Sequence, residues 1–119
     1  MKKNDFYVDG SNSTGLVGQF SMGNEPSFHI PYLFNYFGVP WKTQKWTRFL
    51  LDVWFKDNIF GIPGDEDGGG MSAFVVFTAM GLYPVTPGLP YYNITSPVFE
   101  ETTINLKNGK TFTIITKGA

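Results

Sequence analysis

The sequence contains no cysteine among its 119 residues. Disulfide bonds, thiolate metal sites and a cysteine nucleophile are therefore excluded together. An excess of one charge is also lacking, because nine Lys and Arg side chains stand against ten Asp and Glu side chains, for a formal net charge of −1. Without a basic patch, we expect no binding to nucleic acid or to an anionic membrane surface.

A long apolar run is absent as well. A membrane-spanning helix needs about 18 or more consecutive apolar residues, and no segment supplies them. Lys2 and Lys3 near the start are not followed by an apolar stretch of signal-peptide length. We therefore expect the protein to have no membrane as a binding partner, and we expect no export signal within the sequence as written.

Apolar residues are plentiful, at 42% of the sequence, and aromatic residues reach 18%. Disordered chains have the opposite composition, with low hydrophobicity and high net charge. A globular chain of this size buries roughly two thirds of the surface that it exposes when unfolded. The composition therefore predicts a folded chain, or part of one.

Helical patterns begin after a loop-like region over residues 1–22, which is rich in Asn, Asp, Ser and Gly. The first predicted helix starts at Pro26 or Ser27 and ends at Gly38, a residue suited to the left-handed position after a helix. Pro31 lies inside this segment and can kink or restart the helix.

The clearest periodicity occurs in the segment KTQKWTRFLLDVWFKDN, which predicts an amphipathic helix with Thr43 as its N-cap or a first-turn residue. Charged residues occupy one face of this helix. The apolar face, at spacings of i, i+3, i+4, i+7 and i+8, consists of Trp46, Phe49, Leu50, Val53 and Trp54.

A third helix is predicted from Ser72 to Met80, ending at Gly81, and it is apolar nearly all round, so we expect it to be buried. After Gly88 the residues favour strands. The segments TTINL and TFTII flank Asn108-Gly109, which predicts a hairpin with a type I′ turn. The predicted fold class is therefore mainly α with C-terminal β-strands.

The segment GIPGDEDGGGMS places Asp65, Glu66 and Asp67 beside three glycines, just before the third helix. A phosphate-binding loop would need a lysine, and three acids would repel the anion. An EF-hand loop would need a Glu six residues after its glycine, which is missing. A polar surface turn and the acid/base end of an active site both remain, since neighbouring carboxyl groups push their pKa values apart.

A second polar cluster occurs in GNEPSFHIPY, which contains Asn24, Glu25 and the only histidine, His29. Asn24 and Glu25 are typical of a helix start, where a carboxylate complements the helix dipole. Their oxygen atoms also suit calcium or sugar hydroxyl groups. His29 is interpreted as a hydrogen-bonded core residue rather than a catalytic group.

Three long stretches together resemble glycoside hydrolase family 92, the calcium-dependent, inverting exo-α-mannosidases. The resemblance covers roughly residues 14–116 in order, and its specificity comes from several motifs in sequence. The stretches are TGLVGQFSMGNEPSFHIPYLFNYFGVPWKTQ, GIPGDEDGGGMSAFVVFTAMGLYPVTPG and YNITSPVFEETTINLKNGKTFTI.

The resemblance implies roles for the two polar clusters. Asp67 would be the general base that activates water, and Asp65 would help to hold that water. Glu66 would lie behind them as a further substrate-binding residue. Asn24 and Glu25 would contact Ca²⁺ and mannose. The family's general acid is a Glu in an E-G-N-x-W type motif, which this sequence does not contain, and Glu25 is the alternative candidate for the acid.

The family resemblance also implies an architecture larger than this chain. Residues 1–88 would be a fragment of an (α/α)6 barrel, comprising its last helices, and residues 89–119 would begin a β-strand region after it. The intact enzyme would be periplasmic or secreted and would act on α-mannosides or N-glycans, with the remainder of the parent chain as a necessary partner. The alternative is a non-catalytic carbohydrate-binding or interaction module, which the high aromatic content and the hairpin favour.

Overall fold

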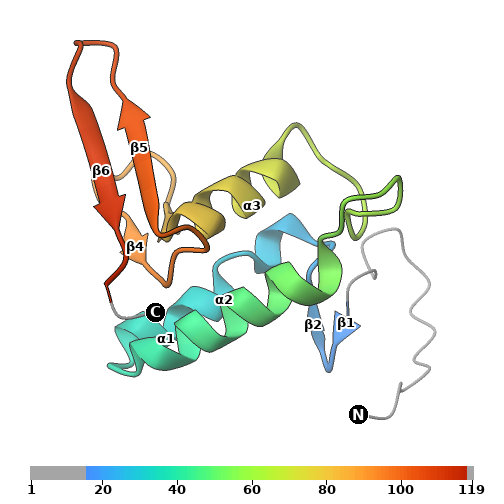
Figure 1. The fold of residues 1–119 in the computed structure, drawn as a ribbon. Helices are drawn as coiled ribbons and strands as arrows, with labels where there is room; N and C mark the ends of the chain where they lie inside the picture. Colours follow the sequence, from blue (N-terminus) through green and yellow to red (C-terminus); the bar gives the residue numbers. More distant parts are fainter. Residues whose placement is uncertain (1–15, 118–119) are drawn as a thin grey trace.

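The computed structural model describes residues 16–117, and it contains three packed helical segments and three small antiparallel sheets. The helical segments and the first two sheets pack together, while the third sheet, a long hairpin, projects from them (Figure 1). Helices thus come before most strands, as predicted. Within the described residues, the helices are too short or too polar to cross a membrane.

A short hairpin opens the described part of the chain, with β1 at Leu16–Val17 and β2 at Phe20–Ser21. The prediction of a loop throughout residues 1–22 is therefore wrong for these strands, and residues 1–15 lie outside the described region. Gly18 makes the reversal possible because it adopts a left-handed φ of 63°.

The first predicted helix is in fact three consecutive short pieces. They are the 3₁₀ turns η1 (Glu25–Ser27) and η2 (Ile30–Tyr32) and the helix α1 (Leu33–Tyr36). Each 3₁₀ turn carries a proline in its first two positions. Pro31 therefore lies at the start of a new helical turn and not inside one continuous helix. Gly38 has the expected left-handed conformation, with φ 72°. His29 is exposed, which makes its interpretation as a core residue wrong.

Helix α2 (Pro40–Trp54) is the predicted amphipathic helix, and it begins three residues before Thr43. Pro40 occupies the first helical position, where a missing N–H costs nothing. Thr43 is fully buried in the first turn and is not the N-cap. Leu50 is buried on the predicted apolar face, but Val53 is 42% exposed.

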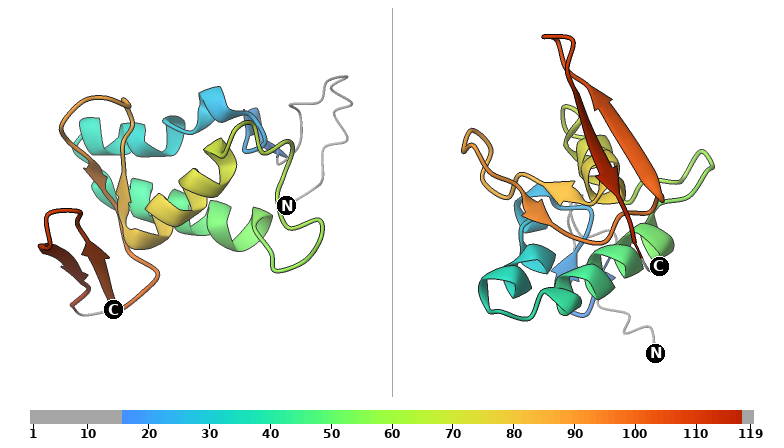
Figure 2. Two further views of the ribbon diagram at one scale, coloured as in Figure 1. Left: turned by 90° about the horizontal axis from the view of Figure 1, so that it is seen from above. Right: turned by 60° about the vertical axis from the view of Figure 1, so that its left-hand side comes forward.

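Helix α3 (Gly70–Met80) crosses above α2 and ends at Gly81, with φ 87° (Figure 2). Only Met71, Phe74 and Thr78 are buried, and Val76 is 55% exposed. The predicted burial on all sides is therefore wrong for the described residues, because α3 packs along one face only.

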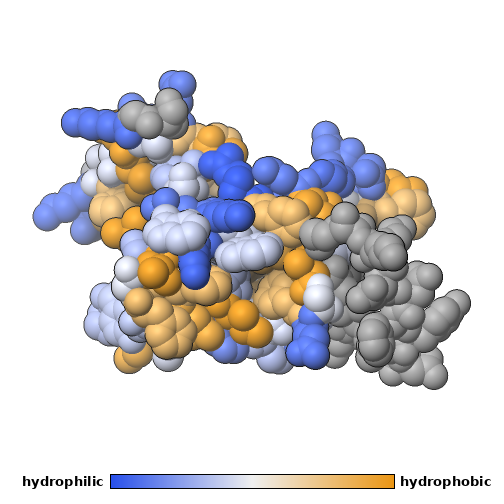
Figure 3. Space-filling view, turned by 90° about the horizontal axis from the view of Figure 1, so that it is seen from below, coloured by the Kyte–Doolittle hydropathy of each residue, from blue (hydrophilic) through white to orange (hydrophobic). Residues whose placement is uncertain are grey.

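The core lies between α3, α2 and the 3₁₀ turns. Phe74 is its centre, with the ring of Phe28 at 4.9 Å and that of Tyr83 at 5.4 Å. The buried apolar residues of the cluster are Met22, Phe28, Tyr32, Leu50, Met71 and Phe74. Apolar side chains also gather on the lower surface of the molecule (Figure 3). Phe37 and Trp41 are among the large apolar side chains that remain exposed.

A second small sheet ties the chain after α3 back to the helices. It pairs β3 (Leu82–Tyr83) with β4 (Asn93–Ile94). The hydroxyls of Thr47 on α2 and Thr95 lie 2.9 Å apart. The β3–β4 pairing joins residues on both sides of the predicted domain boundary at residue 88. The boundary itself stays a prediction.

The predicted C-terminal hairpin is confirmed, with β5 at Glu101–Asn105 and β6 at Thr111–Ile115. Its turn is not type I′, because Gly109 (φ 78°) has a positive φ but Asn108 does not. The Gly109 N–H donates to the Leu106 carbonyl, and the Leu106 N–H to the Lys110 carbonyl. This is the three-residue loop in which a left-handed glycine follows a tight turn.

Candidate active site

The loop between α2 and α3 presents the predicted carboxylates. Asp65 and Asp67 are exposed, and Glu66 is half-buried. Asp67 has φ 45°, and no other non-glycine residue in the described region has a positive φ. Such a backbone costs about 1–3 kcal/mol for a residue with a side chain and is found most often at functional sites. The loop is therefore held in a demanding conformation at Asp67, three residues before α3 begins.

Glu66 caps α3 from inside the loop. Its Oε1 accepts a hydrogen bond from the Ser72 N–H at 3.0 Å, and its Oε2 accepts one from the Ser72 hydroxyl at 3.0 Å. The N-cap residue Gly69 has no side chain to satisfy the first N–H groups of the helix. A carboxylate beside these N–H groups is also favoured by the helix dipole. Both carboxylate oxygens of Glu66, a residue predicted to bind substrate, therefore accept hydrogen bonds from Ser72.

Glu25 reaches the same loop from η1, some 40 residues earlier in the chain. Burial raises the pKa of its carboxyl, and its close contact with the Asp67 carboxyl and the charge of Asp65 raise it further. Glu25 Oε1 is buried and has no hydrogen-bond partner in the described region. Two ionised carboxylates cannot donate to each other, so a shared proton or a bound cation would relieve the repulsion between Glu25 and Asp67. The structure therefore brings together three of the five predicted residues.

Gly70 is what allows this close approach. A Cβ atom placed on Gly70 would lie 3.3 Å from Glu25 Cγ, tighter than ordinary van der Waals contact. The first residue of α3 is thereby packed directly against the Glu25 side chain. The sequence pattern indicates the three glycines and a helix start at Ser72, but it does not predict the contacts of Gly70 with Glu25 or of Ser72 with Glu66. The signal was a helix preceded by three glycines, which must obtain its cap from a residue outside those glycines.

Asn24 lies next to Glu25 and donates from Nδ2 to the Ser27 hydroxyl at 3.2 Å. Its Oδ1 is therefore the atom that could face a cation. Oxygen donors of this kind suit Ca²⁺, and the unpartnered Glu25 Oε1 fits such a ligand. Residues 16–117 hold no group of three His, Asp or Glu side chains arranged for a metal ion. Because Ca²⁺ takes about six to eight oxygen ligands, further donors would have to come from elsewhere.

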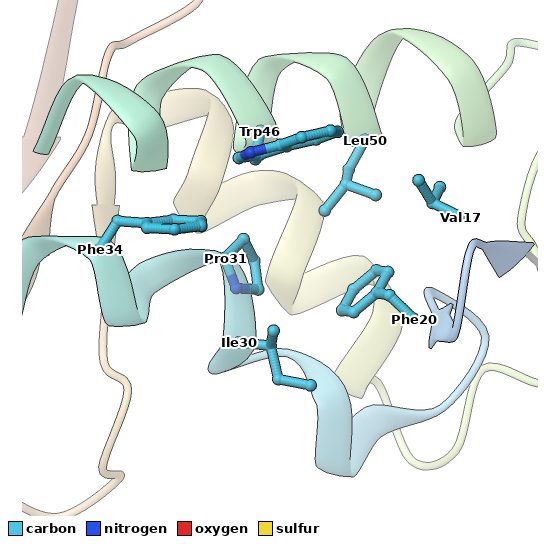
Figure 4. A pocket seen from close by; sticks show the side chains of 7 residues that line it. All are labelled: Val17, Phe20, Ile30, Pro31, Phe34, Trp46 and Leu50. Carbon is cyan, nitrogen blue, oxygen red and sulfur yellow. The ribbon is translucent and has the colours of Figure 1, made fainter. Parts of the chain in front are cut away.

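A separate apolar cavity of about 240 Å³ lies between α2, η2 and the first hairpin (Figure 4). Its lining carries no charged side chain, and none of the five predicted site residues contributes to it. The side chains around it are Val17, Phe20, Ile30, Pro31, Phe34, Trp46 and Leu50. A sugar needs polar partners for its hydroxyl groups, so this cavity is not suited to binding one.

Comparison with known proteins gives these features a family context. The model of the glycosyl hydrolase family 92 catalytic domain matches residues 2–119. An uncharacterized secreted glycosidase of Arthroderma benhamiae is 40% identical over 94 residues, which are 78% of this chain and 12% of the relative.

Solved structures agree with this match. A family GH92 α-mannosidase of Bacteroides thetaiotaomicron, in complex with mannoimidazole, is 39% identical, with a TM-score of 0.82 over 87% of this chain and 14% of that one. A GH92 inverting mannosidase of the same species is 47% identical, with a TM-score of 0.71 over 78% of this chain and 13% of that one. The chain thus spans less than one sixth of the length of these relatives, and it belongs to the glycosyl hydrolase family 92 catalytic domain family.

Proposed function

We propose that the chain is part of the catalytic domain of an inverting, calcium-dependent exo-α-mannosidase that removes mannose from α-mannosides or N-glycans. The observation that carries the proposal is the convergence of Glu25 and the Asp65–Asp67 loop, two segments far apart in the sequence. Family membership and the α-mannosidase relatives support the substrate class. The inverting mechanism draws support from the relative described as an inverting mannosidase.

In an inverting glycosidase, one carboxylate activates water while an acid on the opposite side of the sugar protonates the leaving oxygen. Asp67 serves as the base in our proposal, because its side chain is exposed and its backbone is held in the left-handed conformation. Asp65, two residues earlier and also exposed, helps to hold the water that Asp67 deprotonates. General-base catalysis of this kind contributes about 10²–10⁴-fold to the rate.

Glu25 is not the acid in this scheme. The acid and base of an inverting enzyme lie about 6.5–9.5 Å apart to leave room for water. Glu25 is in direct contact with Asp67, which is too close for that arrangement. We therefore place the general acid in the remainder of the parent protein.

Asn24 and Glu25 would hold Ca²⁺ through Oδ1 and Oε1. When bound, the ion would supply positive charge that orients and polarises sugar hydroxyl groups. Neutralisation of the crowded carboxylates is the reason that we favour a cation here. The charge of the ion would let Glu25 and Asp67 remain ionised side by side.

The architecture follows the same proposal. Helices α1, α2 and α3 would be the last helices of an (α/α)6 barrel, with the β5–β6 hairpin beginning the strand region after it. Exposed apolar residues, such as Val76 on α3 and Phe37 just after α1, would pack on the rest of the barrel. Secretion of the parent is proposed because a relative is described as a secreted glycosidase.

The test is hydrolysis of an aryl α-mannoside by the full-length parent protein, with and without calcium. We expect turnover that a chelator removes, and that Asp67→Asn lowers at least about 100-fold. The anomeric configuration of the first product, followed by NMR, should be inverted. The 119-residue chain alone should give no turnover, because it lacks the acid.

Two results would contradict the proposal. Full activity in Asp67→Asn would show that Asp67 is not the general base. Mannoside binding without hydrolysis, unaffected by Asp65→Asn and Asp67→Asn, would instead favour a carbohydrate-binding module.

A further inference from the structure

Hydrogen bonds to Glu66 and Asp67 close the loop that presents Asp67 onto the first turn of α3. The Glu66 side chain accepts the two hydrogen bonds from Ser72. The Glu66 main-chain carbonyl accepts the Met71 N–H at 3.4 Å, and the Asp67 carbonyl accepts the Gly70 N–H at 3.3 Å. Asp67 is therefore enclosed in a short ring of hydrogen bonds that joins the loop to the first turn of α3.

Between the loop and the buried Met71, the chain consists of glycines. Gly68 and Gly69, which follow Asp67, both have a positive φ, and an added Cβ on either would meet no atom within 4 Å. Glycines without contacts restrict the backbone weakly. The Glu66–Ser72 hydrogen bonds therefore join the loop to the first turn of α3, which the buried Met71 anchors in the core.

The position of that helix start in turn sets the surroundings of Asp67. Gly70 packs against Glu25, and Glu25 contacts the Asp67 carboxyl. A shift of the first turn of α3 would move Gly70 away from Glu25 and would release Asp67 from its left-handed conformation. Displacing a catalytic group by about 1 Å can cost about 100-fold in rate.

We propose that Glu66 is a positioning residue: by bonding Ser72 with both carboxylate oxygens, it holds the Asp67 carboxyl in the orientation needed to activate water. The inference rests on the proposed function, since it takes Asp67 as the general base. It assigns Glu66 no contact with substrate, and it adds Ser72 to the residues on which the reaction depends.

The test uses the full-length protein and the variants Glu66→Ala, Glu66→Gln, Ser72→Ala and the double variant Glu66→Ala/Ser72→Ala. Gln can accept the Ser72 N–H through its oxygen and donate to the Ser72 hydroxyl through its amide. We expect Glu66→Ala to lower kcat about 10- to 100-fold with KM changed less than about 3-fold. Glu66→Gln should restore kcat to within about 5-fold of wild type.

Ser72→Ala removes one of the two hydrogen bonds, so its loss of kcat should be smaller than that of Glu66→Ala. The double variant should be no worse than Glu66→Ala, because the two residues act through one contact. Glu101→Ala, on the exposed face of the hairpin, is the control and should keep wild-type kcat. Circular dichroism of each variant identifies any that fail to fold, and in that case Glu66→Gln and Ser72→Ala decide.

Several outcomes would overturn the inference. If Glu66→Gln is as impaired as Glu66→Ala, or if KM rises with little change in kcat, the charge of Glu66 acts on the substrate. Additive effects in the double variant would show that Ser72 is not its partner. If Asp67→Asn is inactive while Glu66→Ala equals wild type, only this inference fails. Full activity in Asp67→Asn would contradict both this inference and the proposed function.

Discussion

The hydroxyl groups of Tyr32 and Thr78 lie 2.7 Å apart in the protein interior, although 46 positions separate them in the sequence. Tyr32 ends the second 3₁₀ turn, and Thr78 lies in the last turn of α3. Both residues are almost fully buried, so neither hydroxyl can turn to water for a replacement bond. The bond therefore fixes α3 against the segment that carries Glu25.

Replacing Tyr32 by Phe should destabilise the protein by about 1–3 kcal/mol, because the Thr78 hydroxyl would stay buried without a partner. Thr78→Val should lower the stability by a similar amount, because the Tyr32 hydroxyl would then be buried without a partner. The double variant Tyr32→Phe/Thr78→Val should lose less than the sum of the two, since both polar groups are then gone. Denaturant unfolding of the four proteins measures this, and strict additivity would show that the hydroxyls do not interact.

Alkaline pH should weaken the same region. Burial raises the pKa of Tyr83 to about 12, and burial also raises the pKa of Tyr32, whose ring stacks on Tyr83 at 4.8 Å. Because the folded-state pKa exceeds the unfolded value, the stabilising contribution is complete below about pH 10 and is lost as the pH rises toward 12. Urea midpoints measured across this window should fall less in Tyr83→Phe. The exposed Tyr91→Phe is the control, and an equal fall in all three would contradict the assignment.

The elements that the sequence predicts well are those decided by local chemistry. The apolar spacing of α2 and the left-handed Gly81 after α3 needed no distant contact. The turn of the last hairpin was predicted as type I′ because Asn108-Gly109 favours it, but the strand register leaves a three-residue loop instead. The sequence pattern alone cannot count the residues between the last paired positions.

Contacts over a long sequence distance could not be predicted from local patterns. The approach of Glu25 to Asp67 depends on how η1 and α3 pack, and only the family resemblance indicated that both clusters share one site. The apolar character of α3 suggested burial all round, yet Val76 faces outward. Our proposal explains this exposure, because the rest of the barrel would cover the outer face of α3.

Gly81 should tolerate no side chain. It has φ 87°, and a Cβ there would lie 2.6 Å from Pro97 Cγ, so Gly81→Ala adds a clash to the backbone strain. We expect a loss of stability of about 2–4 kcal/mol. Gly109→Ala is the matched control, because Gly109 has φ 78° but open space around it, and it should cost only about 1 kcal/mol. Thermal unfolding compares them, and equal losses would show that the Pro97 contact is unimportant.

Calcium should stabilise the protein through Glu25. The raised pKa of Glu25 means that its ionised form is unfavourable near neutral pH, and this cost disappears as the pH falls below the folded-state pKa. Without calcium, Glu25→Gln should therefore be more stable than wild type at pH 7. Calcium at about 100 times its Kd should stabilise the wild type by about 2.7 kcal/mol and Glu25→Gln much less.

Thermal unfolding of the full-length protein in EDTA and in calcium separates these effects. Glu101→Gln, on the exposed hairpin, controls for the general loss of a charge. Equal calcium stabilisation in wild type and Glu25→Gln would show that the ion binds elsewhere.

The strain at Asp67 distinguishes its chemistry from its contribution to stability. Asp67→Gly removes the carboxylate but suits the φ of 45°, so activity should be lost while stability stays the same or rises by about 1 kcal/mol. Asp65→Gly is the matched control, since Asp65 lacks a positive φ and a glycine there only adds backbone entropy to the unfolded chain. It should lower stability by about 0.5–1 kcal/mol. Were both glycine variants equally destabilised, the left-handed backbone at Asp67 would carry no strain, and its placement would have to come from side-chain contacts alone.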